Sequence, residues 1–82
     1  MTYSVNMILG KQIKAGRILL EITQEELSKR TNTPIATLRR IENSNKISSS
    51  AITLAKIQSL LEDCGIRFNN TQEEISVKLL KK

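Results

Sequence analysis

The sequence contains no histidine, one cysteine (Cys64) and one aspartate (Asp63). A Ser-His-Asp or Cys-His catalytic arrangement is therefore impossible, and so are an intramolecular disulfide and a structural zinc site. The glutamates are dispersed along the chain, so no general acid–base or nucleophilic set can be assembled from them. These absences predict a protein that is not an enzyme and that needs no cofactor or metal ion.

Aromatic residues and long apolar runs are equally scarce. The only aromatic residues are Tyr3 and Phe68, too few for the stacking platforms of single-stranded nucleic-acid-binding proteins. No apolar run approaches the roughly 20 residues that span a bilayer, and residues 1–10 lack the basic start of a signal peptide. We therefore expect a soluble, cytoplasmic binding module with no membrane partner.

Positive charge is what the sequence has in excess. Its 82 residues, enough for one small domain, carry 13 Lys and Arg against 8 Asp and Glu, a formal charge of +5. Residues 1–49 hold eight of the basic and four of the acidic residues, which is +4 of that excess. A polyanionic partner is expected to bind this part, although a charge of this size is also ordinary for a soluble surface.

The first two helices are indicated by apolar spacing and by a capping pattern. From about Asn6 to Leu20, Leu9, Ile13 and Leu20 fall on one helical face. A break at residues 21–22 is followed by Thr23 and Glu26, which form a capping box for a helix that runs to about Thr31.

The third and fourth helices carry clear start and stop signals. Thr33 is the expected N-cap and Pro34 the expected first residue of a helix that ends near Asn43. A polar loop follows, and the serines at 48–50 offer N-caps for a fourth helix that Gly65 terminates.

After Gly65 the apolar period changes from helical to alternating. Ile66 and Phe68 alternate with polar residues, as do Ile75, Val77 and Leu79, which predicts a hairpin with one apolar face. The expected fold is mainly α, with four helices in residues 1–65 and a short β-hairpin in residues 66–82. An isolated hairpin is marginally stable, so this one should pack on the helices of the same domain or form a dimer interface.

Two short helices joined by a turn over about residues 23–43 form a helix-turn-helix. Asn32 in the turn tolerates a left-handed backbone. A helix fits the major groove of B-DNA, and residues near its N-terminus and on its outer face reach base edges. If Leu38 and Ile41 face the core, the groove side of the third helix carries Ile35, Ala36, Thr37, Arg39 and Arg40.

The residues of this region resemble a known family. Arg17, the stretch Thr23-Gln24-Glu25-Glu26-Leu27 and the stretch Thr37-Leu38-Arg39-Arg40-Ile41-Glu42, at these spacings, resemble the phage-repressor (Xre/Cro-type) helix-turn-helix domains. The resemblance extends from about Leu9 to Gly65, and the tail is similar to a small single-domain branch that ends in two strands.

The resemblance implies roles for individual residues. Gln24 would donate its amide to a DNA phosphate at the start of the second helix, and Arg17 would pair with Glu42 inside the domain. Asn43 and Lys46 would meet backbone phosphates after the third helix. The full set of expected DNA-contacting residues is Thr23, Gln24, Thr33, Ile35, Ala36, Thr37, Arg39, Arg40, Asn43 and Lys46.

Two of the expected base-facing residues are apolar. Ile35 and Ala36 can contact a thymine methyl group but cannot form a bidentate hydrogen-bond pair. Direct readout should therefore fall mainly on Arg40, which suits guanine, assisted by Thr37 or Arg39. We expect few strongly specified bases in each half-site.

These observations predict a sequence-specific regulator of transcription, a repressor that binds double-stranded DNA as a homodimer. The operator would be an inverted repeat with half-sites about 34–36 Å apart, and the hairpin is the candidate dimer element. One alternative is an antitoxin that binds a toxin protein and regulates its own operon. A second is an accessory module that kept the fold and lost its affinity for DNA.

Overall fold

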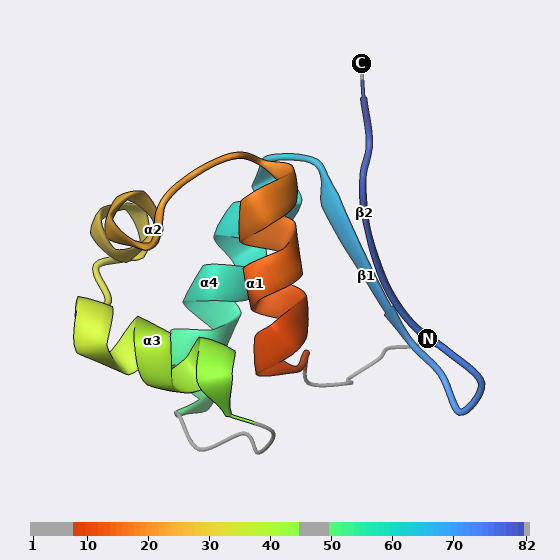
Figure 1. Cartoon of the computed structure of the whole chain (residues 1–82), viewed down its shortest axis with the longest axis horizontal. Coiled ribbons are helices and arrows are strands. Elements are labelled where there is room, and N and C mark those ends of the chain that lie inside the picture. Colours follow the sequence, from red (N-terminus) through yellow and green to blue (C-terminus); the bar gives the residue numbers. More distant parts are fainter. Residues whose placement is uncertain (1–7, 45–49, 82) are drawn as a thin grey trace.

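The computed structural model describes residues 8–44 and 50–81. Its helices are α1 (Gly10–Leu19), α2 (Gln24–Thr31), α3 (Ile35–Asn43) and α4 (Ala51–Asp63), and its strands are β1 (Ile66–Asn70) and β2 (Ile75–Leu79). The hairpin runs beside α1 and α4, on the side of the domain away from α2 and α3 (Figure 1). The expected fold, mainly α with a C-terminal hairpin, is confirmed. No helix in the described ranges is long and apolar enough to cross a membrane.

Side chains from every helix and from β1 form the core. Ile13, Leu27, Leu38, Ile57 and Ile66 are completely buried, so α1–α4 and the first residue of β1 share one apolar interior. A buried glutamine also ties the hairpin to α1, because the amide nitrogen of Gln12 donates to the side-chain oxygen of Asn70 and to the carbonyl of Ser76. These contacts hold the hairpin against the helices.

Helix α1 begins later than the sequence predicts. The expected start near Asn6 lies outside the described residues, and Leu9 has an extended backbone rather than a helical one. The cause is a cap that the sequence analysis missed, since the Gln12 side chain accepts a hydrogen bond from the Leu9 amide at 2.9 Å. The helix therefore starts at Gly10, where α1 passes close to the end of α3.

Gly10 has no room for a side chain, and this leads to a prediction about stability. A Cβ atom there would lie 1.8 Å from the main-chain oxygen of Ile41, so Gly10→Ala is expected to lower the free energy of unfolding by about 2–3 kcal/mol. Gly16→Ala is the matched control, because its Cβ would meet only side chains, at 3.4 Å or more. The helix propensity of alanine should leave that variant near or above wild-type stability. Urea unfolding of both variants measures the difference, and equal midpoints would contradict the proposed clash.

The helix-turn-helix has the expected length, but the predicted start of α3 is wrong by one residue. Asn32 adopts the left-handed conformation, with φ of 52°, and ends α2 as predicted. The N-cap of α3, however, is Pro34 and not Thr33. Pro34 keeps an extended ψ of 139°, so the helix begins one residue later, and the buried Thr33 hydroxyl donates to the carbonyl of Thr31 instead. Helix α4 starts and ends as predicted, because its N-cap is Ser50 and Gly65 follows its last turn.

Candidate nucleic-acid interface

Helix α3 divides into a buried face and an exposed face. Leu38 and Ile41 are buried in the core, which fixes the rotation of the helix. The opposite side carries the predicted groove-facing residues: Ala36, Arg39 and Arg40 are exposed, and Ile35 and Thr37 are partly exposed. The structure therefore brings these five side chains to one surface, which we call the α3 face.

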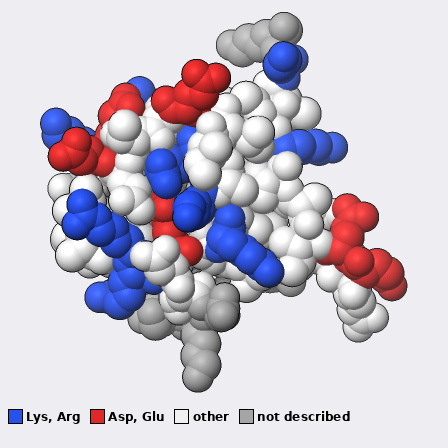
Figure 2. Space-filling model, viewed as in Figure 1, with Lys and Arg blue, Asp and Glu red and all other residues white. Residues whose placement is uncertain are grey.

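The two arginines of the α3 face, Arg39 and Arg40, have no acidic partner in the described residues. Basic side chains lie over α1 and α3 in Figure 2, while acidic side chains lie over α2 and at the tip of the hairpin, where Glu73 and Glu74 are exposed. The exposed arginines of α3 therefore share one face of the molecule with the basic side chains of α1.

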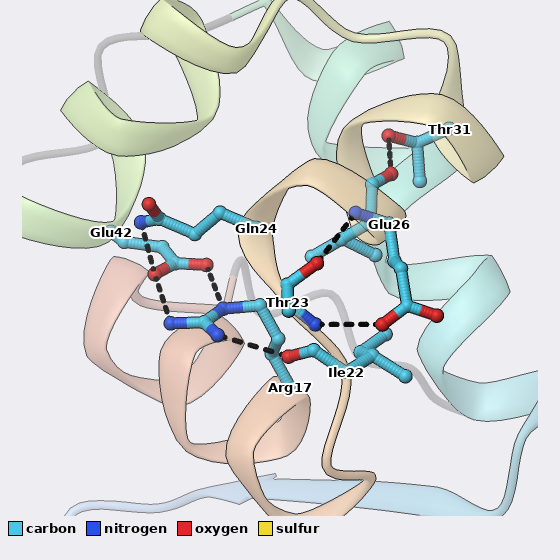
Figure 3. A network of polar contacts seen from close by, with 8 residues as sticks. Arg17, Ile22, Thr23, Gln24, Glu26, Thr31 and Glu42 are labelled. Atoms are coloured by element: carbon cyan, nitrogen blue, oxygen red, sulfur yellow. Dashed lines mark hydrogen bonds and ion pairs between the residues drawn. The ribbon is translucent and has the colours of Figure 1, made fainter.

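An ion pair on the buried side of α3 joins this helix to α1 (Figure 3). The Arg17 guanidinium binds the Glu42 carboxylate through two hydrogen bonds, Nε to Oε2 at 2.9 Å and Nη2 to Oε1 at 3.1 Å. Nη1 of Arg17 also donates to the carbonyl of Ile22, just before α2. The Glu42 side chain is completely buried and that of Arg17 is 13% exposed, so the expected internal pair is present and is shielded from solvent.

Gln24 belongs to the same network. Its amide nitrogen donates to Oε1 of Glu42 at 3.0 Å, so α2 is joined to the ion pair as well (Figure 3). The family resemblance implied that this amide donates to a phosphate, and the sequence analysis missed its contact with Glu42. A side-chain amide nitrogen carries two hydrogens, and the second has no partner among the described residues. One N–H of the Gln24 side chain is therefore left for a further acceptor.

The start of α2 has the predicted capping box. The Thr23 hydroxyl accepts from the Glu26 amide at 3.0 Å, and the Glu26 carboxylate accepts from the Thr23 amide at 3.1 Å. The main-chain amides of Gln24 and Glu25 have no acceptor within the described ranges. Unsatisfied amides at a helix N-terminus are suited to an anion.

The remaining predicted contacts differ in their accessibility. Asn43 is exposed at the end of α3, beside the α3 face. Thr33 is only 3% exposed, and both its amide and its hydroxyl are bonded inside the turn, so its side chain is not on the surface. Lys46 lies outside the described residues.

Comparison with known proteins gives one family. Residues 13–68, more than half of the chain, match the HTH_3 family model, which is described as helix-turn-helix. The match includes α2, the turn and α3 and continues into β1. A search of curated proteins finds no significant match.

Proposed function

We propose that this chain, which belongs to the HTH_3 helix-turn-helix family and is a DNA-binding regulator, acts as a repressor. It would bind a specific double-stranded operator as a homodimer. The observation that carries this proposal is the α3 face: it follows the turn after α2, and its two arginines have no ion-pair partner among the described residues. A network of buried polar contacts holds α3 against α1 and α2 and so presents this face as a rigid surface.

The α3 face would enter the major groove and contact the bases. Ile35 and Ala36, near the N-terminus of α3, would contact thymine methyl groups. Arg40 would bind guanine O6 and N7, with Thr37 beside it and Arg39 at the margin of the groove. Because only Arg40 is assigned a bidentate contact with a base, we expect each half-site to have a few strongly preferred bases.

Phosphate contacts would come from both ends of the helix-turn-helix. At the start of α2, the free N–H of the Gln24 side chain and the main-chain amides of residues 24 and 25 are available to a phosphate near Thr23. After α3, Asn43 and Lys46 would contact the backbone. Thr33 is left out of this interface because its side chain is buried.

One domain presents one α3 face, and this is why we propose a homodimer. Two copies bound to an inverted repeat would place their α3 helices in successive major grooves, about 34–36 Å apart. The longest dimension of the domain is 32 Å, and this length is compatible with two copies placed side by side at that spacing.

Salt dependence tests the proposed binding mode. A dimer that neutralises about six phosphates should lose roughly 10³ in affinity between 50 and 200 mM salt, on operator and on random DNA alike. Selection from random DNA supplies the operator, and a gel shift at both salt concentrations measures the loss. Affinity that does not change with salt, or a selection that enriches no sequence, would contradict a sequence-specific DNA-binding function.

A further inference from the structure

Strand β2 has an open hydrogen-bonding edge. The β1–β2 ladder is antiparallel and pairs Phe68 with Val77. It is flanked by bonds from the Thr71 amide to the Glu74 carbonyl and from the Leu80 amide to the Gly65 carbonyl, both 2.8 Å. Since paired residues alternate between bonded and non-bonded pairs, the main-chain groups of residues 76 and 78 face β1, and those of residues 75, 77 and 79 face away from it.

The two edges of the hairpin differ only near the start of β1, because the outward-facing main-chain groups of Phe68 also have no partner among the described residues. On the outer edge of β1, the Ile66 carbonyl accepts from the Arg67 side chain at 2.7 Å, and Arg67 also reaches the end of α4 through the Glu62 carbonyl. On the outer edge of β2, the main-chain groups of Ile75, Val77 and Leu79 have no partner within the described part of the chain. A free edge of this kind is a template for another strand.

We propose that β2 pairs antiparallel with β2 of a second copy of this chain, with Val77 on the two-fold axis. The two hairpins would then form one four-stranded sheet in the order β1-β2-β2-β1. This proposal rests on the homodimer proposed above and identifies the surface that joins the two copies.

The sequence of β2 is complementary to itself in this register. Val77 lies opposite its own copy, half-exposed Ile75 lies opposite Leu79, and Ser76 lies opposite Lys78, so no like charges meet. Beyond the strand, exposed Lys81 lies opposite exposed Glu73 on both sides of the axis. Cross-strand neighbours of opposite charge stabilise a sheet, and neighbours of like charge destabilise it.

The neighbouring registers are less favourable. Moving the axis to residue 78 would place Lys78 opposite its own copy. Moving it to residue 76 would leave only three residues of each strand paired and would set Leu79 opposite Glu73. An axis that falls between two residues is excluded. It would set the outward-facing main-chain groups of one strand against the inward-facing groups of the other.

Pairing through β2 leaves the α3 face uncovered. The hairpin and α3 lie on opposite sides of the domain (Figure 1), so both copies in the dimer would keep their α3 faces open to DNA. The interface can therefore form before DNA is bound, and it can be tested without DNA.

Amide hydrogen exchange of the full chain without DNA tests the proposed edge. In the dimer, all amides from residue 75 to residue 80 should exchange slowly, and sedimentation should give twice the mass of the chain. A free edge would give a different result: fast exchange at residues 75, 77 and 79 and slow exchange at residues 76, 78 and 80. That alternating pattern, or a mass that stays monomeric as the protein concentration is raised, would overturn the proposal.

Variants at the axis and at the charged pair complete the test. Val77→Pro removes an outward-facing amide, which an edge strand tolerates, and should give a monomer with unchanged helical circular dichroism, whereas Val77→Ala should remain a dimer. Lys81→Glu should weaken the dimer severalfold, and adding Glu73→Lys should restore it, even if Val77→Pro does not fold. A dimer that ignores the charge swap would overturn the register. None of these measurements contains DNA, so a failure of DNA binding would leave them intact.

Discussion

Replacing Glu42 by alanine is expected to lower the free energy of unfolding by about 3–5 kcal/mol, a large part of the stability of a small domain. The completely buried Glu42 carboxylate accepts two hydrogen bonds from Arg17 and one from Gln24. Its removal leaves the Arg17 guanidinium, only 13% exposed, without its anion and breaks the polar link between α1, α2 and α3. Urea unfolding followed by circular dichroism measures the loss.

Three further variants separate this network from other effects. Glu42→Gln keeps a carbonyl acceptor but removes the charge, so it should lose less stability than Glu42→Ala. Arg17→Ala added to Glu42→Ala should cost little more, because the interaction is already absent. Glu25→Ala changes an exposed glutamate in the first turn of α2 and should stay within about 0.5 kcal/mol of wild type. If Glu42→Ala unfolded at the same urea concentration as Glu25→Ala, the ion pair would not stabilise the fold.

Features set by neighbouring residues could be predicted from the sequence. The capping box of Thr23 and Glu26 spans four residues, and the left-handed turn at Asn32 depends on one, so local chemistry determines both. The α3 face was also predictable, since burial of Leu38 and Ile41 fixes the rotation of a helix with a known period. The one local error, at the start of α3, arose because Pro34 is accepted both as the cap and as the first residue of a helix.

Contacts between distant residues could not be predicted from periodicity. Gln12 meets Asn70 across 58 residues, and Gln24 meets Glu42 across 18. Helical spacing says which side of its own helix a side chain occupies, but it does not say which element covers that side. The pairing of Arg17 with Glu42 followed from the family resemblance alone. The contact between Gly10 and the Ile41 carbonyl also needed the packed structure, because it depends on how closely two helices approach.

Replacing Arg40 by alanine is expected to weaken binding to the selected operator by about 1–3 kcal/mol, a loss of roughly fivefold to 150-fold, and to relax the preference at one base position. Arg40 is exposed on the α3 face and has no ion-pair partner among the described residues, so the fold should be unchanged and the thermal midpoint close to wild type. The measurement is a gel shift on the operator, on operators altered one base at a time, and on random DNA.

Three comparison variants decide whether Arg40 contacts a base or a phosphate. Arg40→Lys keeps the charge but loses the bidentate geometry, so affinity for random DNA should remain while discrimination at that base falls. Arg39→Ala alters the adjacent exposed arginine and should reduce affinity less than Arg40→Ala on the operator. Lys46→Ala should weaken binding to all sequences equally and reduce the salt slope by about one unit. If Arg40→Ala and Lys46→Ala lost the same affinity on operator and on random DNA, Arg40 would be a phosphate contact, and sequence recognition would depend on other residues of the α3 face.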